Sequence, residues 1–348
     1  INLYSDLVKQ TILDAQKNII AKTDSEELKN SKIEKIKSEN KDKKIDIKEK
    51  AKKAEDSGFS AFHLADHYLG PGPALEAAAH PVQNIAAVPA IMSAASATNS
   101  IKVGCRVFCT SYRPAGVLAK EAMTIDFLTE GRLELGLGAG WVASEYEALG
   151  IAFDPPGKRI KRLEETISIV KSHMQGDDLD FTGEEVKATG YQGLPAAVKG
   201  KVPLMIGGGA PRVLGIAGRE ADIVSINYNN SAGHLAGSRE TDTANETQKK
   251  IQWVKDGAGN RFEELELEIG AYLTVVTDKQ TETAQSFSEM LGMSEEEILS
   301  FPHALIGSVD YICEELEKRR ELYGISYISF PDNAAESAIP IVEKLSGK

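Results

Sequence analysis

The sequence contains few cysteines and no obvious metal-binding pattern. Its 348 residues include three cysteines, too few for a disulfide scaffold in a chain of this length. Cys105 and Cys109 lie four residues apart, which is not the Cys-x-x-Cys spacing of a redox or metal site. Five histidines also form no ligand-spaced set: His63, His80, His173, His234 and His303. We therefore expect reduced thiols and no metal site.

Long apolar runs and an excess of basic residues are also missing. No run approaches the ~20 residues that a membrane-spanning helix needs, and the first residues lack the basic-then-apolar plan of a signal peptide. The net charge of −12 argues against a nucleic-acid or anionic-membrane surface. These absences predict a cytoplasmic enzyme with a small-molecule substrate, without nucleic-acid or membrane partners, and with a homodimer as a possible assembly.

Residues 1–48 are charged and contain few large apolar side chains. Lysines alternate there with Asp and Glu, which is typical of a solvated helical excursion or a mobile arm. We therefore separate residues 1–48 from a single domain formed by residues 49–348. Two possibilities stay open for the first strand: Asn2 to Ser5 forms it with a long insertion behind it, or the strand is lost or degenerate.

From Gly58 onward, strand and helix patterns alternate. Strands are expected at 60–65, 101–109, 132–138, 203–206, 221–226, 265–277 and 325–330. Helices are expected at 48–57, 82–98, 116–129, 158–174, 212–219, 241–255, 279–300, 309–322 and 334–345. Such alternation gives parallel strands with right-handed crossovers, and about eight units close into a barrel. The fold class is thus α/β, a TIM-type (β/α)8 barrel, with a small hairpin inserted after the fourth helix, between Gln175 and Pro203.

Two glycine-rich strand ends are candidate ligand sites. One is the end of the strand expected at 132–138, which contains Leu133, Leu135 and Leu137 and ends in Gly136-x-Gly138-x-Gly140. A dinucleotide fingerprint needs Gly-x-Gly-x-x-Gly leading directly into a helix, whereas Trp141 follows here, so we exclude a Rossmann site. The second, Ile206 to Arg212, opens through glycines into a helix with Pro in its first turn. Each is either a ligand-binding strand end or an ordinary turn; the second would cradle a phosphate on helix amides.

The pair Asp66-His67 closes the strand at 60–65 and is a candidate for proton handling. An imidazole exchanges protons near neutral pH, and an adjacent carboxylate can fix its tautomer or raise its pKa. A capping or packing role is the alternative for such a pair. Because barrel active sites lie at the carboxyl ends of the strands, the position suits catalysis.

A family resemblance decides among these alternatives. The segments Val117–Ala122, Gly131–Trp141 and Ser144–Asp154 resemble the fourth-strand region of the luciferase-like flavin and deazaflavin oxidoreductases. The resemblance runs from about Ala51 to the C-terminus and is nearest to the branch that uses the deazaflavin coenzyme F420. It implies a bacterial-luciferase-like barrel in which the fourth strand end covers one surface of the cofactor, through Gly138, Ala139, Gly140 and Trp141.

The resemblance also implies roles for the other strand ends. The Asp-His pair of the deazaflavin enzymes touches the cofactor ring, which makes Asp66 and His67 the expected catalytic residues and ring contacts. A non-prolyl cis peptide and a bulge back the ring in this family, which points to Val107, with Cys109 and Thr110 beside it. The expected phosphate cradle is Gly207, Gly208, Gly209 and Ala210. F420 and FMN both carry a phosphate on the ribityl chain, so this cradle cannot separate them.

The sequence departs from the sugar-phosphate dehydrogenase branch at two places. Trp141 stands where that branch has a glutamate acid, and Tyr68 to Pro71 lack the tryptophan that follows its Asp-His pair. We therefore expect an oxidoreductase that transfers a hydride between F420 and an unidentified organic substrate other than a sugar phosphate. The alternatives are an FMN-dependent luciferase-like monooxygenase, a non-catalytic flavin- or deazaflavin-binding protein, and a metal-free barrel lyase acting on a phosphorylated compound.

Overall fold

A computed structural model describes residues 46–78, 80–230, 243–291 and 293–347. From Ile47 onward these residues belong to one compact unit. The predictions for the charged segment up to residue 45, including a strand at Asn2 to Ser5, lie outside the described residues. So do His234 and the first two residues of the helix expected at 241–255.

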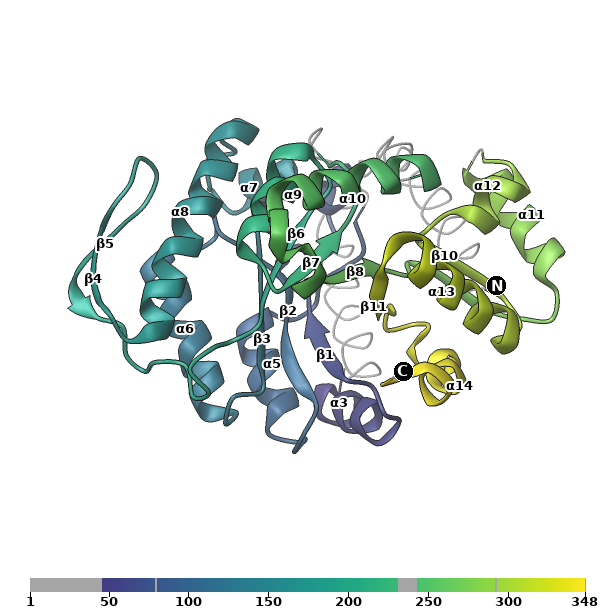
Figure 1. The fold of residues 1–348 in the computed structure, drawn as a ribbon, viewed down its shortest axis with the longest axis horizontal. Helices are drawn as coiled ribbons and strands as arrows, with labels where there is room; N and C mark the ends of the chain where they lie inside the picture. Colours follow the sequence, from purple (N-terminus) through teal and green to yellow (C-terminus); the bar gives the residue numbers. More distant parts are fainter. Residues whose placement is uncertain (1–45, 79, 231–242, 292, 348) are drawn as a thin grey trace, which may run out of the picture. The chain divides into compact units, whose positions relative to one another are not determined.

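The unit is built on a curved sheet of seven parallel strands (Figure 1). The strands lie in the order β1-β2-β3-β6-β7-β8-β11, and each pairs in parallel with its neighbour. Their bounds are Ala61–Leu64 (β1), Lys102–Cys109 (β2), Leu133–Gly138 (β3), Leu204–Gly208 (β6), Ile223–Ile226 (β7), Glu266–Gly270 (β8) and Ile325–Ser329 (β11). Parallel neighbours require crossovers, and the helices between the strands supply them.

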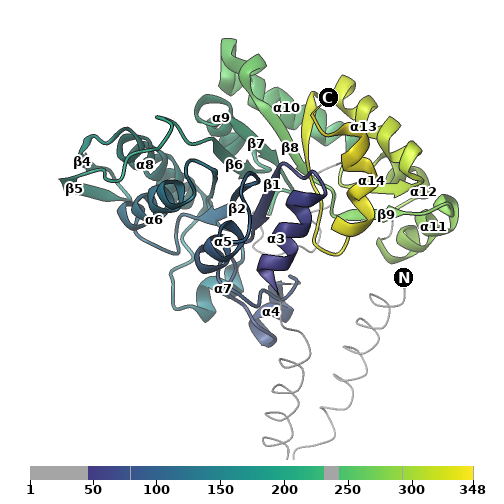
Figure 2. The same ribbon diagram turned by 90° about the horizontal axis from the view of Figure 1, so that it is seen from below.

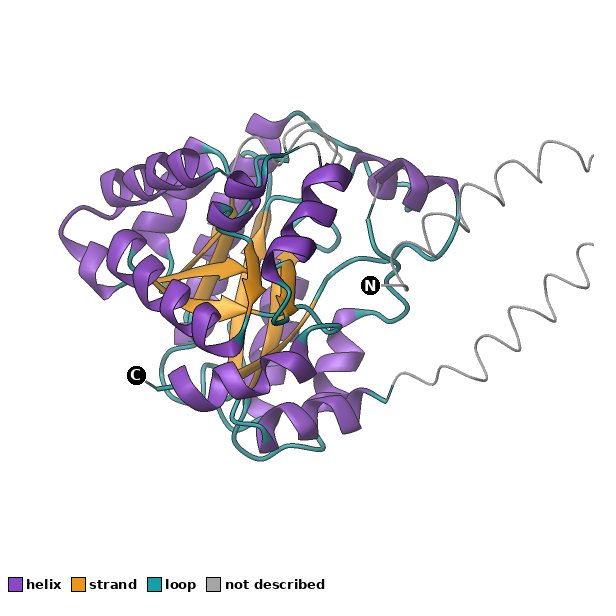
Figure 3. Ribbon diagram, turned by 90° about the vertical axis from the view of Figure 1, so that its right-hand side faces the viewer, coloured by secondary structure: helices purple, strands orange, loops and turns teal. Residues whose placement is uncertain are grey.

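Helices cover the sheet (Figure 3). The long ones are α3 (Ile47–Asp56), α5 (Ala87–Ala95), α6 (Ala115–Leu128), α8 (Pro156–Gln175), α9 (Pro211–Glu220), α10 (Ala244–Ala258), α11 (Gln280–Leu291), α13 (Val309–Tyr323) and α14 (Ala335–Leu345). The apolar stripe of α8 at Leu163, Ile167 and Val170 is at most 1% exposed. It packs into the same core as the leucines of β3, with the partly buried Ile160 beside it.

Short elements escaped prediction. Helices α4 (Pro73–Ala78) and α7 (Ala143–Ala148) have six residues each, and η2 (Gly259–Glu264) is one short 3-10 segment. The six-residue α12 (Glu295–Ser300) lies within the helical stretch expected at 279–300, which divides into α11 and α12. Six residues make less than two helical turns, too few for a periodic pattern to stand out. Helix α5 also begins at Ala87, five residues later than the expected Val82.

The single strand expected at 265–277 is wrong. The chain forms β8, breaks at Ala271 and Tyr272, and continues as β9 (Leu273–Val276). Strand β9 leaves the main sheet and pairs in parallel with β10 (Ala304–Gly307), a strand that the sequence analysis missed. The apolar pattern runs unbroken through the bend, so periodicity could not show that the two halves belong to different sheets.

The hairpin expected between Gln175 and Pro203 is present. Strands β4 (Asp178–Thr182) and β5 (Lys187–Gln192) form an antiparallel pair outside the main sheet. The pair lies beside α8 and α6 (Figure 2). Glu165 of α8 accepts hydrogen bonds from the amides of Glu184, Glu185 and Val186, which fixes the turn to the helix. That this pair is an insertion relative to related barrels stays a prediction.

Strands β1 and β11 are the two ends of the main sheet. Within the described ranges no strand lies between them, so an eighth strand and full closure stay predictions. Buried side chains nevertheless join both ends to β3. The Glu134 carboxylate, 1% exposed, lies 3.1 Å from His63 Nε2 and 2.6 Å from Lys102 Nζ, and accepts a 2.9 Å hydrogen bond from the Tyr327 hydroxyl. We call these four residues the Glu134 cluster.

Candidate active site

The predicted site residues lie at the carboxyl ends of three neighbouring strands. Asp66 and His67 follow β1, Cys109 ends β2, and Gly138 ends β3. In barrels of this kind the loops at these strand ends carry the chemistry. The topology therefore brings the first two predicted stretches together, and the pairing of β1 with β2 and of β2 with β3 places them side by side.

Asp66 serves as an anchor. Its carboxylate, 3% exposed, accepts one hydrogen bond from each terminal nitrogen of Arg113, both 3.0 Å long, and one from the Cys109 amide, also 3.0 Å. The Tyr68 hydroxyl donates a further bond of 3.2 Å. Bidentate pairs of this kind have a fixed geometry. Asp66 therefore ties the chain after β1 to the end of β2 and to the loop that carries Arg113.

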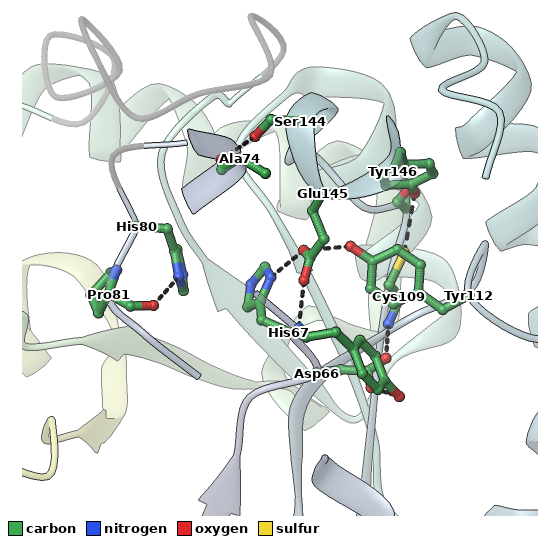
Figure 4. Close-up of polar contacts among 12 residues, drawn as sticks. Asp66, His67, Ala74, His80, Pro81, Cys109, Tyr112, Ser144, Glu145 and Tyr146 are labelled. Atoms are coloured by element: carbon green, nitrogen blue, oxygen red, sulfur yellow. Dashed lines mark hydrogen bonds and ion pairs between the residues drawn. The ribbon is translucent and has the colours of Figure 1, made fainter. Parts of the chain in front are cut away.

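Glu145 orients His67, a function that the sequence analysis gave to Asp66. The Glu145 carboxylate is fully buried at the start of α7, and its Oε2 lies 2.7 Å from His67 Nδ1. It also accepts hydrogen bonds of 2.6 Å from the Tyr112 hydroxyl and from the Tyr68 amide. Figure 4 shows the carboxylate between the imidazole and the Tyr112 ring. The expectation that Asp66 fixes the tautomer is therefore wrong, because all hydrogen bonds of its carboxylate go to other groups.

These contacts keep Glu145 ionised. Burial alone would raise the pKa of its carboxyl group, but His67, Tyr112 and the Tyr68 amide together lower it below the usual value. A carboxylate that accepts from Nδ1 selects the tautomer with the proton on that nitrogen. The second ring nitrogen, Nε2, is then the one available for exchange with a substrate.

Two aromatic residues lie against the His67 ring. The His80 ring centroid is 4.2 Å away and that of Trp141 is 5.9 Å away. Burial, and then the charge of His67, lower the pKa of His80 to about 4. His80 is therefore neutral at pH 7, and its Nδ1 donates to the Pro81 carbonyl at 2.9 Å. Trp141, one of the predicted wall residues, thus contacts the predicted proton-handling residue.

Val107 lies at the strand end where the family resemblance implied a cis peptide and a bulge. The peptide bond between Arg106 and Val107 is cis, and the register of β2 against β3 shifts between Cys105 and Phe108. Both expected features of this strand end are confirmed. A Cβ built on Gly136, Gly138 or Gly207 would come within 2.9, 2.6 and 3.3 Å of the Val107 side chain. These glycines leave room for Val107, which stays half-buried over three strand ends.

Several other predicted cofactor residues are held by Tyr146. Its hydroxyl lies 3.1 Å from Cys109 Sγ and donates to the Ala139 carbonyl at 3.3 Å. Gly140 has φ +73°, and a Cβ there would lie 1.9 Å from the same hydroxyl. Thr110 donates to the Gly138 carbonyl at 3.2 Å. Burial raises the pKa of Cys109 to about 11, so this residue is a neutral thiol, as expected.

The third predicted stretch joins β6 to α9. Ala210 is the extended N-cap of α9 and Pro211 its first residue, as the sequence predicted for a helix with exposed amides. The glycines have packing reasons of their own, however. A Cβ on Gly208 would lie 2.3 Å from Val213, and one on Gly209 would lie 2.2 Å from the main-chain oxygen of Tyr228. Valine at either position would therefore disturb the fold, and such variants cannot report on phosphate binding.

A large surface hollow lies elsewhere. It measures about 650 Å³ and lies between α8, the β4–β5 turn and α9, away from the strand ends. Its charged side chains pair with one another: Arg219 with Glu164 at 3.1 Å, and Lys161 with Glu165 at 3.5 Å. A site whose charges are already paired is a poor candidate for a ligand.

Two expected absences can be examined over the described residues. No group of three or more His, Cys, Asp or Glu side chains there could hold a metal ion. No helix in the same ranges is long and apolar enough to cross a membrane. The three cysteines are buried and free of disulfides, as predicted.

Comparison with known families identifies the fold. The family model described as luciferase-like monooxygenase matches residues 35–289. The chain belongs to this family. The match begins before Ala51, where we placed the start of the resemblance, and it ends before the C-terminal helices.

Curated relatives of this luciferase-like protein include two enzymes. A 5,10-methylenetetrahydromethanopterin reductase from Methanolobus tindarius is 26% identical over 243 residues, covering 69% of this chain and 64% of the relative. An F420-dependent glucose-6-phosphate dehydrogenase from Amycolatopsis mediterranei is 29% identical over 183 residues, covering 51% of each. The chain thus spans about half to two thirds of the length of these relatives.

Solved structures confirm the fold of this luciferase-like chain. The coenzyme F420 dependent tetrahydromethanopterin reductase from Methanopyrus kandleri superposes with a TM-score of 0.66 at 16% identity, covering 86% of this chain and 95% of that one. At this identity the likeness shows the fold alone. It supports the luciferase-like barrel as the architecture to which the seven-stranded sheet belongs.

Sequence reasoning missed Glu145 and Arg113. Glu145 lies in the segment that carried the family resemblance, but 78 positions separate it from His67, so no spacing rule connects the two. Arg113 lies four residues after the end of β2, and a systematic look at polar residues after each strand would have found it.

Proposed function

We propose that this protein is an oxidoreductase that transfers a hydride between F420 and an organic substrate. The membership of the luciferase-like family supports a flavin-type cofactor, and one of the relatives above is named for F420. The observation that carries the proposal is the His67–Glu145 pair, which is buried on the carboxylate side and lies at the carboxyl end of the sheet.

The residues at the strand ends fit such a cofactor. Val107 is half-buried, and the missing side chains of the glycines around it leave it room to back the face of a planar ring as a platform. Gly138 to Trp141 would form a wall beside it, with Cys109 and Thr110 behind. Ala210 and the first amides of α9 would hold the phosphate, with Gly207 to Gly209 as the approach. F420, when bound, supplies the hydride chemistry, and the protein supplies position and electrostatics.

His67 would move the proton that accompanies hydride transfer. Glu145 holds Nδ1, so Nε2 would give a proton to, or take one from, the substrate oxygen or nitrogen. Asp66 would act as a positioning residue, because its bonds to Arg113 and Cys109 fix the loop on which His67 stands.

A cofactor titration tests the proposal. We expect F420 to bind with a saturable change in its fluorescence and FMN to bind at least ~10-fold more weakly, a difference of about 1.4 kcal/mol. Substrate-dependent oxidation or reduction of F420 should follow. Tighter binding of FMN than of F420 would contradict the choice of cofactor.

Gly207→Ala tests the platform with a small change. Its Cβ would lie 3.3 Å from Val107 and 3.8 Å from Ser225, a tight contact that the side chain of Val107 can relieve by shifting. Cofactor affinity should fall while the thermal transition stays cooperative. Gly215→Ala on α9 is the control, since a Cβ there meets nothing within 4 Å. Equal cofactor affinity in both variants would show that the cofactor ring does not bind against Val107.

Other functions make different predictions. An FMN-dependent monooxygenase, which the family name favours, would consume oxygen with reduced FMN. A storage protein would bind cofactor tightly without turnover, and a lyase would turn over without any redox cofactor. We further propose a small-molecule substrate, no nucleic-acid or membrane partner, and cytoplasmic location. A homodimer is a possible assembly, which light scattering during gel filtration measures.

A further inference from the structure

A second polar centre lies at the carboxyl ends of β2, β7 and β8. Arg106 precedes Val107 on β2, Asn227 directly follows β7, and Tyr272 lies two residues after β8. All three side chains are half-buried. Arg106 belongs to the strand end singled out around Val107, whereas Asn227 and Tyr272 were not predicted from sequence. The His67 site uses none of the three.

The hydrogen bonds at Tyr272 leave its proton available. Its hydroxyl oxygen accepts from Arg106 Nη1 at 3.1 Å and from Asn227 Nδ2 at 2.9 Å. The Asn227 amide cannot turn its oxygen to Tyr272, because that oxygen accepts from the Tyr228 amide at 2.8 Å. A guanidinium and an amide NH2 have no acceptor to offer. The phenol therefore receives two hydrogen bonds, and its own O–H must point to a third group.

The buried carboxylate of Glu268 compensates the charge of Arg106. Its Nε lies 2.8 Å from Glu268 Oε1, and Glu268 is fully buried. Burial alone would lower the pKa of Arg106, but Glu268 and then Tyr272 raise it above the usual range. Lys250, behind Asn227, donates to the main-chain carbonyl of Asn227 at 2.7 Å. The centre thus presents the Tyr272 hydroxyl beside a guanidinium whose charge Glu268 opposes.

Aromatic rings surround the phenol. Tyr272 stacks on His303 with ring centroids 5.1 Å apart and an interplanar angle of 20°, and Tyr228 lies 5.6 Å from Tyr272. Phe301 packs on His303 at 5.5 Å. Aromatic rings beside one oriented donor are typical of sites that hold a small organic molecule by a few polar atoms.

We propose that the Tyr272 hydroxyl donates a hydrogen bond to a neutral acceptor oxygen of the substrate, a carbonyl or its equivalent. Because Arg106 is followed by Val107, this subsite adjoins the proposed ring platform, where a substrate of hydride transfer must lie. The assignment to the redox substrate rests on the proposed function. The binding of an acceptor oxygen does not, and it is measured without cofactor.

The test compares a neutral ketone with an anion of the same shape. Cyclohexanone and cyclohexanecarboxylate are titrated into the cofactor-free protein by ligand-observed NMR. Wild type should bind the ketone, and Tyr272→Phe should bind it ~10-fold more weakly, the scale of one hydrogen bond. The carboxylate should bind more weakly than the ketone to wild type. Tyr191→Phe, which removes a hydroxyl from the β4–β5 hairpin, should bind the ketone as wild type does.

Asn227→Asp gives a sharper variant, because it retains Tyr272. The carboxylate can still accept from the Tyr228 amide, but its second oxygen would accept the Tyr272 proton and withdraw it from the ligand. We expect the same loss of ketone affinity, with a cooperative thermal transition as the check on folding. Ketone binding that is undetectable in wild type, unchanged in Tyr272→Phe or Asn227→Asp, or weaker than carboxylate binding would overturn the proposal. The F420 titration reports separately on the proposed function.

Discussion

Two buried glutamates of this protein have nearly the same partners but lie towards opposite ends of the parallel strands. Glu134 lies against His63, Lys102 and the Tyr327 hydroxyl, and Glu145 against His67, the Tyr112 hydroxyl and a main-chain amide. Both side chains are at most 1% exposed. Each carboxylate therefore holds one imidazole and one phenol.

The difference between them lies in the remaining partner and in the position. Lys102 gives Glu134 a compensating charge, and this cluster lies near the amino end of β3. Glu145 has an amide in place of the lysine, and its histidine lies at the carboxyl end of β1. In barrels the amino-end residues serve stability and the carboxyl-end residues serve chemistry. If the proposed function holds, the same three residue types serve two purposes, and their position and neighbours separate them.

Replacing His67 or His63 should show the largest difference between the residues around Glu145 and the Glu134 cluster. His67→Ala should lower the turnover number by ~10²–10⁴ with a much smaller change in cofactor affinity, since it removes the proposed proton carrier. His63→Ala should leave turnover per folded molecule within about threefold and lower the melting temperature instead, because it removes one partner of a buried carboxylate. Steady-state kinetics and thermal unfolding check both. Normal turnover in His67→Ala would remove the acid/base role.

Acid should unfold the protein through Glu134. Burial alone would raise the pKa of this carboxyl group, but His63 and Lys102 lower it to about 2 from 4.5. A lowered folded-state pKa contributes stability above the unfolded value, and this stability is lost as the pH falls from about 4.5 towards 2. The contribution is about 3 kcal/mol. Glu134→Gln should flatten the acid limb of denaturant-measured stability, and a limb of unchanged slope would point to other carboxylates.

Glu145→Gln should act on turnover. The amide can no longer compensate an imidazolium or select the tautomer by accepting a strong hydrogen bond from Nδ1. We expect a ~10- to 100-fold lower kcat, a changed pH profile of kcat and a nearly constant KM for cofactor. Combined with His67→Ala it should add little, because the two residues act as a unit. Additive losses would show that Glu145 acts independently.

The phenols should give the smallest effects. Tyr327→Phe removes one hydrogen bond to Glu134 and should lower stability by about 1 kcal/mol with turnover unchanged. Tyr112→Phe removes the matching bond to Glu145 and should lower kcat a few-fold with little change in melting temperature. If Tyr327→Phe and Tyr112→Phe both change stability, or both change kcat, the two glutamates do not have different roles.

The elements at strand ends were predictable because local patterns specify them. The parallel α/β alternation, the hairpin after α8, the cis bond at Val107 and the entry into α9 through Ala210 and Pro211 all followed from short segments or from the resemblance they carry. The contacts of His67 were not predictable in this way. Asp66 is adjacent to His67 in sequence but forms its hydrogen bonds with Arg113, whereas Glu145 lies in the helix that follows β3 in the chain. Neighbouring residues on a chain leaving a strand point in different directions, so adjacency misled the assignment.

The bond between Tyr327 and Glu134 also concerns the order in which the protein is made. It joins β11, the last strand, to β3, across 193 positions of the chain. Such long-range contacts must wait for loop closure, which slows folding. During synthesis, the strands β1 to β3 leave the ribosome before the Tyr327 hydroxyl has been added to the chain. The Glu134 cluster can therefore be completed only after β11 has been translated, whatever the state of the earlier strands.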